Sequence, residues 1–323
     1  MSDAQAMVLA AGLGTRLWPL TADRAKPAVP FIGKPLVVWV LDLLAAHGVT
    51  RATLNTHHRP TSIARAIRGV HELELAISHE ETILGTAGAL AKARDEGLLD
   101  RRRTTLIINA KLFTDLDLTS ALRAHEQSGA AVTMVLRRNP ERAAFREVLV
   151  GGDRVIGFGA SIEPRGADPL LFTGVHLIDA AVLAAIPAGR ECDTIRDVYP
   201  PLIAAGRVHA HVDDRGRWWE FSTLARYLDL HRRASAEGLG ADVVLGAGAS
   251  IAEGAEVRSS VLWENATVGE GAVLDQVVVG AEVLIPPGLR LTRAAVICAS
   301  HAGGAIPQGE IRGDLIVVPI APA

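Results

Sequence analysis

A short glycine-containing loop near the start of the chain has the residue types that bind phosphate. Gly12 and Gly14 let backbone N–H groups approach phosphate oxygens, because no Cβ stands in the way. Thr15 adds a hydroxyl, Arg16 a fork of N–H donors and Lys26 a compact positive charge. A tight structural turn would also use two glycines. The elements around the loop must therefore decide between the two interpretations.

Those elements alternate between short apolar strands and helical patterns over the first two thirds of the chain. Predicted strands cover residues 6–10, 52–55, 73–78 and 104–109, and predicted helices cover 36–47, 60–68 and 85–94. This alternation indicates a parallel, doubly wound sheet. Antiparallel additions to the sheet are predicted over 131–137, 147–151, 155–158 and 172–178, and a closing helix over about 223–236. The first strand then ends at the sheet edge where α/β proteins bind ligands.

The last third of the chain repeats with a period of 17 residues, beginning at about residue 241. The matching columns are 251/268/285, 254/271/288, 257/274/291 and 262/279/296. Aliphatic residues about every six positions with glycine at the corners are typical of a parallel β-helix. Three coils are close to the minimum that can bury such a stack. We therefore expect the β-helix to pack on the first domain or on another subunit.

The composition excludes several classes of protein. A net charge of −3 gives the 323-residue chain no polycationic surface for nucleic acid or anionic lipid. The most apolar stretch, residues 35–46, contains Asp42 and is too short to span a membrane. An apolar strand begins within about six residues of the start, which leaves no room for a signal peptide and predicts a cytoplasmic protein. Cys192 and Cys298 are too few for a disulfide framework or a cysteine-based zinc site.

Several linked motifs accompany the loop. They lie at residues 9–21, 26–30, 33–36, 55–58, 84–90, 172–176 and 218–223. With them the chain resembles the sugar-1-phosphate nucleotidyltransferase family, and most of all its mannose-1-phosphate guanylyltransferases and related NDP-sugar synthases. The resemblance covers essentially the whole chain. It implies an α/β fold with a Rossmann-like, doubly wound mixed sheet followed by a short left-handed parallel β-helix. We expect a nucleotidyltransferase domain over residues 1–238, a β-helix domain over 239–300 and a C-terminal tail over 301–323.

The resemblance implies that a sugar 1-phosphate attacks the α-phosphate of an NTP, giving an NDP-sugar and pyrophosphate. Such chemistry needs positioning and charge neutralisation rather than a protein nucleophile. By motif position, Arg16 binds the departing pyrophosphate and Lys26 the α-phosphate, as the two catalytic residues, while Thr173 and Gly174 contact the sugar. The same comparison implies a larger set of nucleotide contacts: Leu9, Ala11, Gly12, Gly14, Thr15, Arg16, Lys26, Glu80, Gly85, Thr86 and Asn109.

Glu80 bears on the choice of base. It precedes the Gly85–Gly88 turn by five residues, where the family places a base-reading side chain. A carboxylate can accept hydrogen bonds from N1–H and N2–H of guanine, which favours GTP over UTP or dTTP. The alternative is a solvated glutamate beside Glu81. His57 and His58 lack zinc-ligand spacing and are expected to cap or pack at a strand end.

Position 111 departs from the family pattern. Active members continue the strand after Asn109 with Gly-Asp, and that Asp holds the catalytic Mg²⁺; here the residues are Ala110 and Lys111. At about 4 Å and an effective dielectric of about 20, a unit positive charge repels a dication by roughly 8 kcal/mol. The second ligand position holds Glu220, one methylene longer than the family's Asp. We therefore expect Mg²⁺ binding to be weakened or lost, with Glu220 as the remaining protein ligand.

Three interpretations of Lys111 remain open at this point. Its ammonium replaces the metal and holds nucleotide without efficient transfer; or the chain is an inactive form that folds and binds; or Lys111 points into solvent and Mg²⁺ uses Glu220, phosphate oxygens and water. The hypotheses for function are an impaired NDP-hexose-forming enzyme and a catalytically inactive regulatory homologue that binds nucleotide or NDP-sugar.

A hexapeptide acyltransferase is a weaker alternative, because three coils offer little groove for an acyl carrier and His301 alone is poor support for a base. A short β-helix with an apolar end also favours a homo-oligomer.

Overall fold

The computed structural model describes residues 4–159, 169–303 and 307–321, and they divide into two compact units. The first unit contains the residues up to Gly12, then Trp39–His57 and Arg68–Trp218. The second unit contains Leu13–Val38, His58–Ile67 and the residues from Trp219 onward. The predicted first domain is therefore shared between the two units, and each is described by itself.

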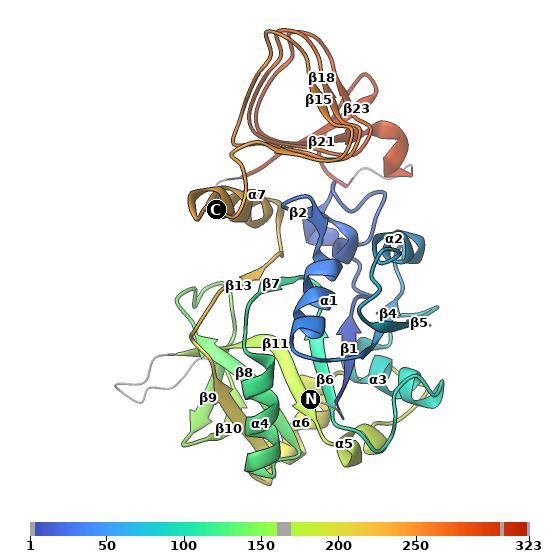
Figure 1. The fold of residues 1–323 in the computed structure, drawn as a ribbon, viewed down its shortest axis with the longest axis vertical. Coiled ribbons are helices and arrows are strands. Elements are labelled where there is room, and N and C mark those ends of the chain that lie inside the picture. Colours follow the sequence, from blue (N-terminus) through green and yellow to red (C-terminus); the bar gives the residue numbers. More distant parts are fainter. Residues whose placement is uncertain (1–3, 160–168, 304–306, 322–323) are drawn as a thin grey trace. The chain divides into compact units, whose positions relative to one another are not determined.

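A nine-stranded mixed sheet is the framework of the first unit (Figure 1), in the order β5-β4-β1-β6-β11-β8-β12-β10-β9. The strands are β1 (Gln5–Leu9), β4 (Arg51–Thr56), β5 (Glu74–His79), β6 (Thr105–Asn109), β8 (Val132–Arg138), β9 (Glu147–Gly151), β10 (Arg154–Phe158), β11 (Leu170–Ile178) and β12 (Val208–Val212). β1, β4, β5 and β6 are parallel, whereas β11 is antiparallel to β6, β8 and β9. The doubly wound mixed sheet is thus confirmed. The carboxyl ends of β1, β4, β5 and β6 lie at one edge.

Helices cover both faces of this sheet. Alternate side chains of β8 point to opposite faces of the sheet, so the contacts of Met134 and Thr133 show which helices cover each face. Met134 shares a buried core with residues of α3 (Gly85–Asp95), α5 (Ala180–Ala185) and α6 (Tyr199–Ala204). Thr133 instead contacts His125 of α4 (Leu118–Ser128), their Oγ1 and Nδ1 atoms lying 3.0 Å apart. α3, α5 and α6 therefore pack on one face and α4 on the other. The chain passes from the second unit to the first within α1 (Leu36–Ala46).

The non-repetitive part of the second unit packs around aromatic side chains. Its elements are the short helices η1 (Thr15–Leu17) and η2 (Lys26–Ala28), the hairpin β2 (Pro30–Phe31) and β3 (Lys34–Pro35), and the helices α2 (Pro60–Ala66) and α7 (Leu224–Ala236). Phe31 contacts Phe221 and His231, with ring centroids 4.8 and 4.7 Å away. The Tyr227 hydroxyl donates to the Pro30 carbonyl at 2.6 Å and accepts from the indole N–H of Trp263 at 3.0 Å. The predicted helix over 223–236 is confirmed as α7, capped by the Thr223 side chain.

The predicted 17-residue repeat is a left-handed β-helix of stacked parallel strands. Its strands are β14 (Val244–Leu245), β15 (Ser250–Ile251), β16 (Glu256–Arg258), β17 (Val261–Leu262), β18 (Thr267–Val268), β19 (Val273–Val279), β20 (Leu284–Ile285) and β21 (Arg290–Cys298). Ile251 pairs with Val268 and Val268 with Ile285, and the other apolar columns pair at the same offset. The inward aliphatics of successive coils form one core.

The residues after 300, expected as a tail, add strands to the β-helix. β23 (Leu315–Pro319) pairs antiparallel with β21, and β22 (Glu310–Arg312) pairs with β23. Leu315 and Val317 join the β-helix core. None of the helices in the described ranges is long and apolar enough to cross a membrane.

His231 gives the second unit a pH-dependent stability. Its Nδ1 lies 3.0 Å from the Tyr227 carbonyl, and its Nε2 accepts the Ile32 N–H at 3.4 Å. Burial lowers the pKa of His231 from 6.5 to about 4, although the Tyr227 carbonyl opposes this. Because the unfolded chain binds this proton more readily, the stabilisation is complete above pH 6.5 and is lost as the pH falls towards 4.

We therefore expect the melting temperature to fall by several degrees between pH 6.5 and 4. His231→Gln removes the ionisable group and should flatten this decline, even though it lowers stability at neutral pH. Thermal melts of both proteins across the range provide the measurement. Parallel declines in the two proteins would count against the assignment.

Candidate functional site

The loop after β1 lies at the edge where the parallel strands end. The Ala10 N–H donates to Oδ1 of Asn55 at 2.7 Å, and the Leu9 carbonyl accepts from the Ala110 N–H at 3.0 Å. Gly12 is exposed, and a Cβ built on it would meet no heavy atom within 4 Å. Its backbone also lacks a positive φ. Neither conformation nor internal packing requires glycine at position 12, which favours the ligand-binding interpretation over a structural turn.

Two buried side chains join this loop to the start of α3. Asn55, at the end of β4, donates from Nδ2 to Oε1 of Glu80 at 2.7 Å. The other oxygen of Glu80, Oε2, accepts the Leu84 N–H at 2.9 Å. Glu80 is 1% exposed, so the alternative of a solvated glutamate is wrong. The carboxylate connects Asn55 to the Leu84–Gly88 turn, and its reading of a base stays a prediction.

Glu80→Gln tests this connection with almost no change in shape. Asn55 cannot rotate its amide, because Oδ1 already accepts from Ala10. A glutamine amide at position 80 therefore places its NH₂ group against a donor, either Nδ2 of Asn55 or the N–H of Leu84. We expect a loss of about 1–3 kcal/mol in unfolding free energy. Denaturant titration of the two proteins measures it; equal midpoints and slopes would refute the bridging role.

The turn that begins α3 contains two predicted nucleotide contacts, Gly85 and Thr86. Gly85 has a φ of +73°, and a Cβ there would lie 2.6 Å from the Cys192 carbonyl oxygen. The Thr86 hydroxyl lies 3.0 Å from Oδ2 of Asp193, to which it donates. Both residues are therefore held by the segment that contains Cys192. His57, as expected, packs at a strand end, with its Nδ1 2.8 Å from the Glu80 carbonyl.

Asn109 and Gly174 come together at the adjacent strands β6 and β11. Gly174 has a φ of +81°, and a Cβ there would lie 2.3 Å from Nδ2 of Asn109. Glycine at 174 therefore leaves the space that the Asn109 side chain occupies. Thr173 points into the protein: its hydroxyl donates to the Val135 carbonyl at 2.7 Å, and its own carbonyl accepts from the Trp218 indole at 2.7 Å. Of the two predicted sugar contacts, only Gly174 lies beside a predicted nucleotide contact.

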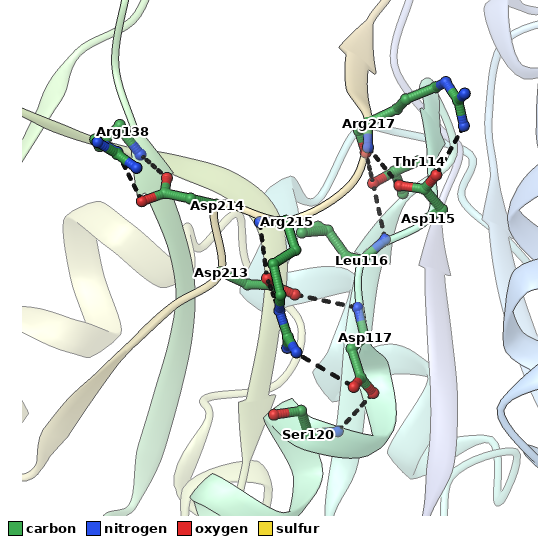
Figure 2. A network of polar contacts seen from close by, with 10 residues as sticks. All are labelled: Thr114, Asp115, Leu116, Asp117, Ser120, Arg138, Asp213, Asp214, Arg215 and Arg217. Carbon is green, nitrogen blue, oxygen red and sulfur yellow. Dashed lines mark hydrogen bonds and ion pairs between the residues drawn. The ribbon is translucent and has the colours of Figure 1, made fainter.

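Lys111 occupies the two-residue turn between β6 and β7 (Leu112–Thr114) and is half-buried. Figure 2 shows the polar network that follows this turn in the first unit. Asp115 pairs with the guanidinium of Arg217 at 3.0 Å and accepts its backbone N–H, while Asp117 caps α4 by accepting the Ser120 N–H at 2.8 Å. Asp115 and Asp117, the acidic residues that follow Lys111, therefore have structural partners in Arg217 and in the start of α4.

Asp213 is the buried centre of the same network (Figure 2), 3% exposed. Burial alone would raise the pKa of Asp213, but hydrogen bonds from the Arg215 side chain and from the backbone N–H of Asp117 and Arg215 hold that pKa below its usual range. The Arg215 guanidinium lies 3.0 Å from the Asp213 carboxylate. The Asp213 carboxylate therefore forms a structural ion pair with the Arg215 guanidinium.

Mg²⁺ binding through Glu220, phosphate oxygens and water stays a prediction, because Mg²⁺ often uses only one or two protein carboxylates. Within the described ranges, no group of three or more His, Cys, Asp or Glu side chains is placed to hold a metal ion. Lys111 takes one family ligand position, and Glu220 at the other is 5% exposed. A cation at a ligand position opposes a second cation, so no catalytic step is assigned to a metal here.

The second unit carries the remaining predicted phosphate contacts. Thr15 and Arg16 are exposed on η1. Gly14, just before them, has a φ of +70°, and a Cβ there would lie 3.1 Å from Cβ of Lys26, so this glycine has a structural role. Lys26 is 8% exposed, and its Nζ donates to the Ser222 carbonyl at 3.5 Å. The exposed Thr15 and Arg16 are suited to binding an anion, whereas Lys26 is buried and contacts Ser222 of the same unit.

Sequence reasoning missed two residues of this region, Asn55 as a buried connector and Asp193 as a partner of Thr86. A polar residue at the end of an apolar strand was the available signal for Asn55. Nothing local marked Asp193, because its partner is 107 positions away in the sequence.

Comparisons with known proteins show the family of the chain. A family model described as nucleotidyl transferase matches residues 5–237, and one described as GlmU-like, C-terminal hexapeptide matches residues 238–295. A mannose-1-phosphate guanylyltransferase of Mycobacterium tuberculosis is 32% identical over 297 residues, covering 90% of this chain and 79% of that protein. A UTP–glucose-1-phosphate uridylyltransferase of Synechocystis is 29% identical, covering 69% of this chain and 61% of that protein.

Among solved structures, HddC from Yersinia pseudotuberculosis, complexed with GMP-PN, matches with a TM-score of 0.60 and 18% identity. The match covers 71% of this chain and 98% of HddC. At this identity the likeness concerns the fold alone.

Proposed function

The chain belongs to the nucleotidyl transferase family, with a GlmU-like hexapeptide domain, and on that premise we propose that it binds GTP and a mannose 1-phosphate-like sugar phosphate and transfers the nucleotidyl group slowly. The observation that carries the proposal is the edge of the sheet in the first unit. There Gly12 is open, and Asn55 and Glu80 fasten its loop to the Leu84–Gly88 turn. A fixed edge with an open backbone is suited to binding a nucleotide without reorganisation.

In the proposed reaction a phosphate oxygen of the sugar 1-phosphate forms a bond to the α-phosphorus of GTP. The bond from that phosphorus to the β-phosphate oxygen breaks, and pyrophosphate leaves with the electron pair. Arg16 is suited to the leaving pyrophosphate, because its guanidinium is exposed and can bind two oxygens at once. Lys26 is assigned to the α-phosphate. The protein contributes position and positive charge rather than a nucleophile.

A second candidate function is favoured by Lys111. An ammonium at the ligand position can hold nucleotide phosphate while opposing Mg²⁺. The protein would then be a binding or regulatory homologue, which senses nucleotide or NDP-sugar and assembles through its β-helix.

Two measurements on the same preparation separate these functions. Pyrophosphate release is followed with GTP, UTP or dTTP, each with mannose 1-phosphate or glucose 1-phosphate, in the presence of Mg²⁺. Binding of each nucleotide is measured by calorimetry. Slow release that is fastest with GTP and mannose 1-phosphate supports the enzyme; tight binding with no release supports the regulatory homologue. Absence of both would refute the proposed function.

A further inference from the structure

The segment Cys192–Thr194 is joined to the turn that begins α3 by backbone hydrogen bonds. The Cys192 N–H donates to the Leu84 carbonyl at 2.8 Å. The Cys192 carbonyl accepts from the N–H groups of Ala87 and Gly88, at 2.9 and 3.0 Å. The first amides of a helix have no partner within the helix itself. Here two of them are satisfied by a segment about a hundred residues further along the chain.

Side chains add a second set of hydrogen bonds between this segment and the turn. The Thr86 hydroxyl donates to Oδ2 of Asp193 at 3.0 Å and accepts the Thr194 N–H at 2.8 Å. The other oxygen of Asp193, Oδ1, accepts the N–H groups of Ile195 and Arg196, at 2.9 and 3.0 Å. Asp193 thus caps the helical turn that follows it with one oxygen and holds Thr86 with the other.

Two glycines permit the close approach. A Cβ on Gly85 would lie 2.6 Å from the Cys192 carbonyl oxygen, and one on Gly88 would lie 2.9 Å from the Arg190 carbonyl oxygen. Both distances are shorter than a carbon–oxygen contact allows. Glycine at these two positions therefore allows the turn to pack directly against the segment 190–194.

These contacts change what the start of α3 can offer a ligand. The amides of Ala87 and Gly88 already donate to Cys192, and the Thr86 hydroxyl already donates to Asp193. What the turn can supply is a fixed shape, held on one side by Glu80 through the Leu84 N–H and on the other by Asp193 through Thr86. We propose that Asp193 is a positioning residue for nucleoside binding, acting through Thr86 on the Leu84–Gly88 turn; this rests on the proposed function.

Asp193→Asn tests the inference with little change of shape. Oδ1 can still cap Ile195 and Arg196, but the amide NH₂ group cannot accept the Thr86 hydroxyl, whose remaining acceptor is the Thr194 hydroxyl 3.0 Å away. Asp153→Asn is the matched control, because it makes the same chemical change in the same unit at an exposed carboxylate. Three quantities are compared: the dissociation constant for GTP by calorimetry, the melting temperature, and hydrogen exchange at the amides of Ala87 and Gly88.

We expect Asp193→Asn to raise the GTP dissociation constant about tenfold and to speed exchange at both amides, with a melting temperature close to that of the control. If turnover is measurable, KM for GTP should rise while KM for mannose 1-phosphate stays unchanged. A GTP affinity equal to that of Asp153→Asn, or one lowered only together with the melting temperature, would overturn the positioning role.

The outcomes also separate this inference from the proposed function. A parent protein that binds none of the nucleotides overturns the proposed function, and with it the nucleoside role of Asp193. A parent that binds GTP as tightly as the Asp193→Asn variant overturns the inference alone. Thr86→Ser in the parent provides a further check: it keeps the hydroxyl, so exchange at the amides of Ala87 and Gly88 should stay slow.

Discussion

Lys111→Asp is expected to raise the rate of pyrophosphate release from GTP and mannose 1-phosphate by about 100-fold in the presence of Mg²⁺. The substitution changes the charge in the turn after β6 by two units and supplies a carboxylate where the family pattern has one. The lysine ammonium repels a dication by roughly 8 kcal/mol at about 4 Å, whereas an aspartate carboxylate at the same place attracts it. A fraction of this energy difference is enough for a rate increase of about 100-fold. Initial rates of the variant and parent, each at several Mg²⁺ concentrations, provide the measurement.

Lys111→Asn is the control for this experiment. It removes the positive charge but adds no carboxylate, so it separates relief of repulsion from creation of a metal ligand. We expect Lys111→Asn to gain much less than Lys111→Asp and to need more Mg²⁺. If the Asp variant is as slow as the parent at every Mg²⁺ concentration, Lys111 does not limit turnover and the regulatory homologue becomes the better description.

The second large effect is expected from Gly246→Ala, which should destabilise the second unit by about 3 kcal/mol. A Cβ at position 246 would lie 2.6 Å from both the Glu264 nitrogen and the Trp263 carbonyl carbon. These are backbone atoms of the next coil. Gly246 is itself fixed, because its N–H donates to the Leu262 carbonyl at 2.7 Å. Neither coil can move without breaking its ladder.

Denaturant unfolding followed through tryptophan fluorescence measures this loss, since Trp263 is 2% exposed. Gly69→Ala is the matched control, because a Cβ there would meet nothing within 4 Å and the glycine has no positive φ. We expect the control to unfold at the parent's midpoint or slightly above it. Equal midpoints for Gly246→Ala and the parent would show that adjacent coils are looser than these distances indicate.

The repeating parts of the fold could be predicted from the sequence because their signals are local. Alternating apolar strands and helices gave β1, β4, β5 and β6 to within one residue or so at their ends. The 17-residue period gave the strand register of the β-helix directly, because residues one period apart are ladder partners. Other elements, α4 and β12, were missed, although Asp117 caps α4 and the apolar residues of β12 alternate with histidines. The segment of β12 is only five residues long, and its partner β8 lies about 75 positions earlier in the sequence.

The candidate site could be predicted only in its outline. The pattern around Gly12 predicts a ligand-binding loop, but the burial of Glu80 depends on Asn55, 25 positions earlier, and on Leu84. A lone glutamate in a sequence carries no sign of such partners. Thr86 and Asp193 illustrate the same limit, because only the folded sheet brings α3 and the segment after α5 together.

The ladder of the β-helix also restricts how the length of this protein can vary. The parallel ladder from β14 to β21 pairs residues that are 17 positions apart, so the loss or gain of one residue within a strand would misalign every column that follows. Removing or duplicating a whole coil keeps each aliphatic above an aliphatic and each corner glycine above a glycine. Related chains should therefore differ in this region by whole coils, and smaller insertions should be confined to the corners.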